Sequence, residues 1–132
     1  NDDSLVKSIA FDSNITSGRA FPDQQGAAVA TVDGVIHILD SSYERKVATL
    51  TGHGGPIWSL DVSPDGRTLA SGSDDGTVRL WRLASRSHLF TLTDHGSAVV
   101  QVRFSPDGSI LATGSVDGTV RLRSTDTSMG KQ

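Results

Sequence analysis

The sequence predicts an all-β protein made of repeated antiparallel meanders, and three observations lead to this prediction. Short segments recur at a spacing of 42 residues, so that SGSDDGTVRLW at 71–81 returns as TGSVDGTVRLR at 113–123. Apolar and polar residues alternate over short runs, as in strands with one buried face. The chain contains 14 glycines and 5% aromatic residues, a composition that suits many short strands joined by tight turns.

The second repeat shows the clearest succession of strands. Trp58, Leu60 and Val62 alternate with polar residues and predict the inner strand. The turn SPDG at 63–66 follows, in which proline presets φ and glycine accepts a positive φ. Asp75-Gly76 is a two-residue hairpin signal between the next two strands. We expect the remaining strands at 68–73, 77–81 and 87–92.

The third repeat has the same order of strands, and the first repeat departs from it. The third predicts an inner strand by the alternation of Val100, Val102 and Phe104, then strands at 110–115 and 119–122, and lacks an outer strand, unless Thr125–Met129 pairs weakly.

For the first repeat we expect an inner strand at Leu5–Phe11, followed by strands at 27–32, 35–39 and 47–50. Phe11 and Val62 are 51 residues apart whereas Asp33 and Asp75 are 42 apart, which predicts nine inserted residues within Asp12–Gly26. Long loops on rigid scaffolds often bind partners, so Arg19 and Phe21 are candidate contact residues.

The order of these motifs resembles a known family. Gly52-His53, SPDG, and DDGTVRLW ending at Trp81 are together similar to the WD-repeat family of β-propellers of the seven-bladed type. The resemblance covers three repeats of about 42 residues, the first degenerate. It implies a single propeller segment over 1–132, with blade 1 at about 4–51, blade 2 at about 56–93, blade 3 at about 98–124 and a tail at 125–132. Closed propellers have roughly 4–8 blades, so we expect an incomplete ring, completed by further copies of the chain or by the remaining blades of a longer one.

The resemblance also implies a buried polar network in each blade. In blade 2 its members are His53, Ser71, Asp75 and Trp81, and in blade 3 they are His95, Thr113 and Asp117, with Arg123 in place of tryptophan. Blade 1 retains only Asp33, because Val29 and Leu39 occupy the serine and tryptophan positions. A buried imidazole needs a partner at both nitrogens, which the carboxylate and the hydroxyl supply.

Serine, histidine and aspartate are also the parts of a hydrolase triad. The chain lacks a G-x-S-x-G nucleophile elbow, and Ser71 falls within a predicted buried strand. We therefore predict a structural role for this group and no catalytic residues.

Composition argues against several other classes of function. The net charge of −3 provides no basic excess for phosphate contacts, and the absence of cysteine removes thiolate metal sites. The longest apolar run is four residues, at 27–30, against roughly 20 for a membrane span. We expect no metal, no cofactor, no nucleic-acid or membrane partner, and a cytoplasmic location.

The interpretation that best fits these features is a non-catalytic protein–protein interaction scaffold. In the family the top of the ring is a common docking surface, which implies Trp58, Asp74, Val100 and Val116 as contact residues; for Trp58, packing within the inner strand is an equal alternative. Two alternatives stay open: a regulatory or assembly segment of a larger multidomain enzyme or sensor, and a ligand-binding central channel. By alternation we expect His37 to face solvent. Three arginines should lie on solvent faces or pair with acids between blades: Arg79, Arg103 and Arg121.

Overall fold

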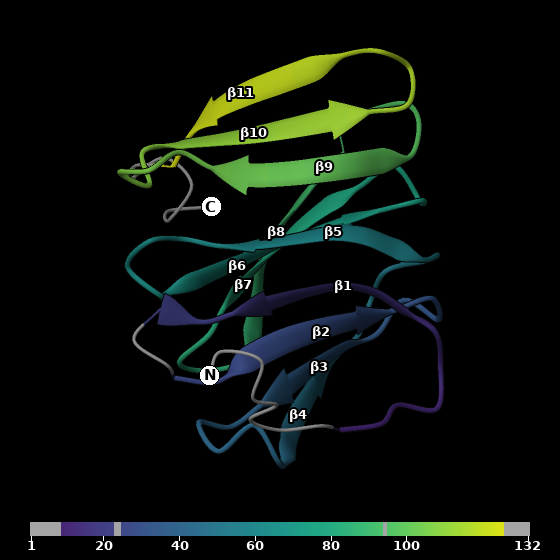
Figure 1. Ribbon diagram of the computed structural model, residues 1–132. Coiled ribbons are helices and arrows are strands. Elements are labelled where there is room, and N and C mark those ends of the chain that lie inside the picture. Colours follow the sequence, from purple (N-terminus) through teal and green to yellow (C-terminus); the bar gives the residue numbers. More distant parts are fainter. Residues whose placement is uncertain (1–8, 23–24, 94, 126–132) are drawn as a thin grey trace, which may run out of the picture.

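The computed structural model describes residues 9–22, 25–93 and 95–125, which form three antiparallel β-sheets (Figure 1). The strands of blade 1 are β1 (Ile15–Ala20), β2 (Ala27–Thr31), β3 (Ile36–Leu39) and β4 (Lys46–Leu50). Those of blade 2 are β5 (Ile57–Val62), β6 (Thr68–Ser73), β7 (Val78–Arg82) and β8 (Ser87–Leu92). Those of blade 3 are β9 (Val99–Phe104), β10 (Ile110–Ser115) and β11 (Val120–Ser124).

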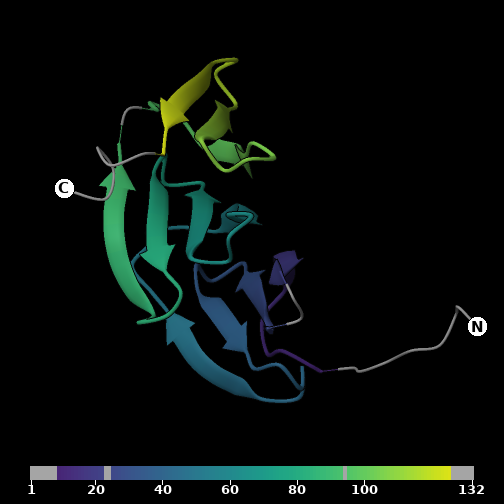
Figure 2. The same cartoon turned by 90° about the vertical axis from the view of Figure 1, so that its left-hand side faces the viewer.

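Each blade is a meander in which strands adjacent in sequence pair with one another. The inner strands β1, β5 and β9 lie beside one another (Figure 1). Figure 2 shows the three sheets following one another in an open arc, with the outer strands β4 and β8 along the opposite side from the inner strands. This arrangement confirms the expected fold class of propeller blades, the last with three strands among the described residues.

The proposed weak strand at Thr125–Met129 falls almost wholly outside the described residues. Thr125 itself is described and is not part of a strand. Its N–H donates to the Ser109 carbonyl at 2.9 Å, which closes the end of β11 against the preceding turn.

The prediction for the inner strand of blade 1 is wrong. Residues 5–8 lie outside the described part of the chain, residues 9–11 are not in a strand, and β1 begins at Ile15. Ile15 pairs with Thr31 as Ile57 pairs with Ser73, so the 42-residue period holds through blade 1.

No nine-residue insertion exists, and Arg19 belongs to β1 rather than to a loop. The physical reason is that Leu5–Phe11 is rich in apolar and β-branched residues, which are typical of a strand. The true strand, ITSGRA, contains glycine and polar residues and lacks a marked apolar pattern, because neither of its faces is deeply buried.

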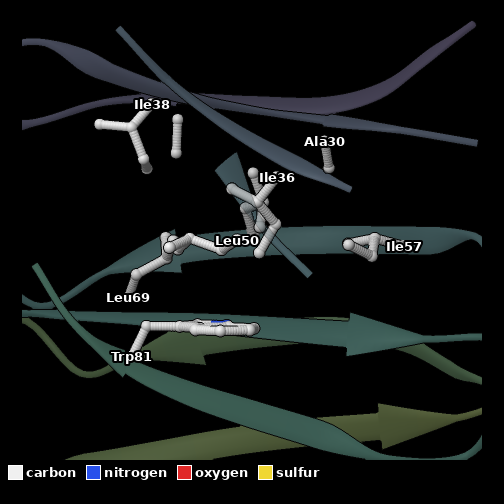
Figure 3. Close-up of a cluster of buried hydrophobic side chains, with 9 residues drawn as sticks. Ala30, Ile36, Ile38, Leu50, Ile57, Leu69 and Trp81 are labelled. Atoms are coloured by element: carbon white, nitrogen blue, oxygen red, sulfur yellow. The ribbon is translucent and has the colours of Figure 1, made fainter. Parts of the chain in front are cut away.

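The hydrophobic core lies between the blades. One cluster joins β2 and β3 of blade 1 to the facing side of blade 2; Figure 3 shows its members Ala30 and Ile36 from blade 1 and Ile57, Leu69 and Trp81 from blade 2. A second cluster joins the other side of blade 2 to blade 3; its buried members are Ala70, Val78, Leu80, Val99, Val102 and Leu111. Full burial of one large aliphatic side chain contributes about 1.5–3 kcal/mol, so contact between blades is the main source of stability.

Gly72 permits the close approach of blade 3 to blade 2. A Cβ at this position would lie 2.7 Å from Val99 Cγ1 and 3.1 Å from Val102 Cγ1. The same position in blade 3 is Gly114, where the nearest contact would be Gln101 Cβ at 3.7 Å. The two glycines therefore occupy one register position and differ only in whether a neighbouring blade covers them.

This difference makes a matched pair of substitutions. We predict that Gly72→Val lowers the free energy of unfolding by about 1–3 kcal/mol, the usual effect of overpacking a filled interface. Gly114→Val should change it little, because a β-branched residue suits a strand and its Cβ would make only an ordinary contact, with Gln101 Cβ at 3.7 Å. Urea unfolding followed by tryptophan fluorescence measures both. Equal losses in the two variants would contradict the close packing of Gly72 against blade 3.

Candidate functional site

The polar network of blade 2 connects a loop, two strands and a hairpin turn. His53 Nε2 lies 2.7 Å from Ser71 Oγ on β6, and His53 Nδ1 lies 3.3 Å from Asp75 Oδ2 in the turn. The indole N–H of Trp81 on β7 donates to the same Ser71 oxygen at 3.0 Å. The structure thus brings together all four residues that the family resemblance implied.

The turn is held by further bonds that the sequence analysis did not identify. Asp75 Oδ2 accepts the Gly54 N–H at 2.7 Å, and Asp75 Oδ1 accepts the Thr77 hydroxyl at 2.6 Å. The Thr77 hydroxyl also lies 3.3 Å from His53 Nδ1. The repetition of Thr after Asp-Gly at 77 and 119 was the sequence signal for this role.

Burial and these bonds set the protonation states of the pair. Burial lowers the pKa of His53, and the nearby Asp75 carboxylate only partly opposes this effect. Burial alone would raise the pKa of Asp75, but the bonds from Thr77 and Gly54 outweigh it and lower the pKa to about 2. At neutral pH the network therefore contains a neutral imidazole and an ionised carboxylate.

Blade 3 has a shorter version of the network. His95 Nε2 lies 2.8 Å from Thr113 Oγ1, and His95 Nδ1 lies 3.4 Å from the Thr119 hydroxyl. That hydroxyl donates to Asp117 Oδ1 at 2.6 Å, so threonine connects the histidine to the carboxylate. The lowered pKa of Asp117 comes mainly from this bond.

Blade 1 has a different polar group, centred on Thr31. Its hydroxyl donates to Asp33 and lies 3.2 Å from Nε2 of His37. The expectation that His37 faces solvent is wrong, because its ring is half-buried and contacts the Phe11 ring at a centroid distance of 5.0 Å. Burial lowers the pKa of His37. The position of Ser71 is taken by Val29, whose side chain cannot accept a hydrogen bond, so the network of blade 2 has no equivalent here.

The Ser-His-Asp group of blade 2 resembles a hydrolase triad in its order of contacts but is closed to substrates. Ser71 is fully buried, and its oxygen is already shared by His53 and Trp81. A nucleophile must reach a substrate carbonyl, which this oxygen cannot do. The group therefore acts as a structural clamp within the blade.

Four of the candidate contact residues lie at the end of the sheets where the Asp-Gly turns are found. Trp58 is 39% exposed, and its indole N–H donates to Asp74 Oδ1 at 3.1 Å. Val100 and Val116 are 40% and 63% exposed, and Val32 at the equivalent turn of blade 1 is 37% exposed. Backbone bonds from Asp74 to Pro56 and from Val116 to Ala98 hold each turn beside the start of its inner strand. We call these five residues the DG-turn surface: Val32, Trp58, Asp74, Val100 and Val116.

The other two candidates, Arg19 and Phe21, lie elsewhere. Arg19 Nε is 3.5 Å from Asp61 Oδ1 on the inner strand of blade 2. Phe21 packs against the core cluster and lines a groove of about 440 Å³ between blades 1 and 2. Both residues join neighbouring blades: Arg19 belongs to β1, and Phe21 follows it in the short connection to β2, where its N–H donates to the Gly26 carbonyl.

Asp61 is an important residue that the sequence analysis missed. Its Oδ2 accepts the Phe104 N–H at 2.7 Å from blade 3, while its Oδ1 pairs with Arg19 of blade 1. Nearby, Ser59 Oγ accepts the Val102 N–H at 3.1 Å. The available signal was an aspartate within a strand, which is disfavoured unless its carboxylate has partners.

Two further classes of site are absent from the part of the chain that the structure describes. No group of three or more His, Cys, Asp or Glu side chains converges there in a way that could hold a metal ion. No helix in that part is long and apolar enough to cross a membrane.

The clamp in blade 2 makes a prediction about stability. Ser71→Ala should lower the free energy of unfolding by about 1–3 kcal/mol or more, because it leaves Nε2 of His53 and the buried indole N–H of Trp81 without their hydrogen-bond partner. Ser85→Ala, which removes an exposed serine hydroxyl bonded to Ser87, is the matched control and should change it little. Urea unfolding at pH 7.5 measures both, and a neutral effect of Ser71→Ala would contradict the clamp.

The pKa shifts predict acid destabilisation. The pKa of His53 is lower in the folded chain than its ordinary value of 6.5, so the unfolded chain binds more protons and stability falls as the pH drops below 6.5. A second loss follows between pH 3.8 and about 2 as Asp75 is protonated. Unfolding measured from pH 8 to 5 should show the first loss, and His53→Gln should reduce its slope. Stability that increases as the pH falls through this range would contradict the prediction.

Comparison with known proteins supports the interpretation of the repeats. The family described as WD domain, G-beta repeat (WD40) matches residues 44–82 and 86–124, more than half of the chain. No curated protein was found to match. Two solved structures, of U3-55K and of the RRP9 WD40 repeats, each align with a TM-score of 0.85 and 26% identity over 90% of this chain. The chain spans 38% of the length of each. With the two matched repeats and the blade geometry in agreement, the chain belongs to the WD40 family of β-propeller repeats.

Proposed function

We propose that this WD40 segment is a non-catalytic interaction scaffold and that a protein partner docks on its DG-turn surface. WD40 repeat domains are generally protein-interaction scaffolds, and the chain contains two matched repeats. The observation that carries the proposal is the exposed Trp58 ring, which is held in place by its bond to Asp74. An ordered aromatic side chain loses little entropy on binding and often contributes most of the energy of an interface.

The surroundings of Trp58 suggest the chemistry of the partner. Exposed valines extend the apolar area on both sides, from Val32 in blade 1 to Val100 and Val116 in blade 3. The DG turns beside these residues contain the exposed aspartates Asp33, Asp74, Asp75 and Asp117, which make this end of the blades acidic. Complementary charge favours and orients binding, so the surface suits an extended peptide with apolar and basic side chains.

The sealed Ser-His-Asp clamp supports a role without catalysis. An enzyme needs titratable groups that converge in an accessible cleft. The strongest such combination in the described residues has its serine fully buried and its hydrogen bonds occupied. The repeated polar groups therefore stabilise blades, and the exposed residues are left for binding.

Selection from a displayed random-peptide library tests the proposal. Peptides retained by the native chain should bind Trp58→Ala at least tenfold more weakly, because loss of an interface tryptophan costs about 2 kcal/mol or more. Arg45→Ala is the control, since Arg45 is exposed in the β3–β4 turn and lies outside the DG-turn surface. Isothermal calorimetry gives the dissociation constants. Peptides that bind the native chain and Trp58→Ala equally would place the docking site elsewhere.

A further inference from the structure

Blade 3 has an uncovered apolar face. Val120 and Leu122 of β11 are 68% and 70% exposed, whereas their equivalents in blade 2, Val78 and Leu80, are each 1% exposed. Ile110 on the neighbouring strand is 37% exposed. We call this surface the blade 3 face, and it consists of Ile110, Ala112, Gly114, Val120 and Leu122.

The equivalent face of blade 2 shows what such a surface receives. There Ala70, Val78 and Leu80 pack against large apolar side chains of the next blade, contributed by Val99, Val102 and Leu111. Gly72 leaves room for that inner strand, and Gly114 leaves the same room on blade 3. The blade 3 face therefore continues an interface that already exists twice within the chain.

Charge adds a second requirement on the partner. Arg19 and Arg103 occupy the same register position, opposite Ala28 on β2 and Ala112 on β10. In blade 1 this arginine pairs with Asp61 of the next inner strand at 3.5 Å. Arg103 is exposed and donates to its neighbouring carbonyl at Val102. The next inner strand should therefore carry a carboxylate where blade 2 has Asp61.

Blade 1 of a second copy does not meet these requirements. At the position of the buried Leu60 and Val102 it has Gly18, and at the position of Leu69 it has Ala27. These small residues would leave the apolar face poorly filled, at the cost that cavities impose. Arg19 would also stand where the acid is required, so it would repel Arg103.

We propose that the blade 3 face binds a blade of different sequence, with large apolar residues at the Leu60 and Leu69 positions and an acid at the Asp61 position. A second copy of this chain lacks that chemistry. The inference takes one assumption from the proposed function, namely that the segment is part of a larger propeller. It identifies the partner of one face by its side chains, and it is independent of the DG-turn surface.

A designed donor chain serves as the probe. The full chain carrying Gly18→Leu, Arg19→Asp and Ala27→Leu presents the required side chains on its blade 1, and a Cβ at Gly18 has room because its nearest contact is 3.8 Å. Sedimentation velocity measures binding of this donor to native chain labelled at its N-terminus. The donor should bind at least tenfold more tightly than unlabelled native chain does. This gain should disappear when the labelled chain carries Leu122→Asp or Arg103→Asp, and should persist with the charge-matched control Arg45→Asp.

Two outcomes would overturn the proposal. One is a donor that is folded, as judged by circular dichroism, yet binds no more tightly than the native chain. The other is a native chain that closes into a ring by itself and loses this ability with Leu122→Asp, since the second copy would then be the occupant.

If the donor does not fold, the self-association of the native chain carrying Arg103→Asp is measured instead. The carboxylate introduced at position 103 would face Arg19 of the next copy, so self-association should strengthen several-fold at low salt, and no change would contradict the charge requirement. The DG-turn surface is tested separately by peptide binding to Trp58→Ala, so each proposal can fail without the other.

Discussion

The structure depends on the packing of one sheet face against the next inner strand. A four-stranded meander has two faces and cannot bury both by itself, so each blade is stable only against its neighbours. Blade 2 is covered on both sides, and its Leu60, Leu69 and Leu80 are almost fully buried. Blade 3 repeats the same sequence pattern without a neighbour on one side, and Val120 and Leu122 on that side are exposed. The difference in burial comes from position in the arc and not from residue type.

Hydrogen bonds from side chains complement this apolar packing at two levels. Within a blade, the His53–Ser71–Trp81 bonds connect a loop to the middle strands. Between blades, Asp61 connects blade 1 to blade 3 through Arg19 and the Phe104 N–H. Because apolar contact has little directional preference, the directional bonds of Asp61 fix the register of one blade against another.

The sequence repeat and the folded sheet do not coincide. The matched repeat at 44–82 begins at the outer strand β4 of blade 1 and continues through β5–β7 of blade 2. The covalent chain therefore joins adjacent blades, in addition to the contacts between their faces. Each polar network lies within a single blade, whereas the DG-turn surface consists of residues from all three blades.

The sequence by itself determined the features that depend on local chemistry. The 42-residue period, the Asp-Gly turns and the alternation of Trp58, Leu60 and Val62 were enough to predict the strands of blades 2 and 3, and the family resemblance indicated the partners of His53. The tertiary structure alone decided where β1 lies, because ITSGRA has no marked apolar pattern and is placed by pairing with β2. It also decided that Asp61 bridges three blades and that Val120 is exposed while Val78 is buried. These features depend on which blade stands beside which, and a repeated local pattern does not contain that information.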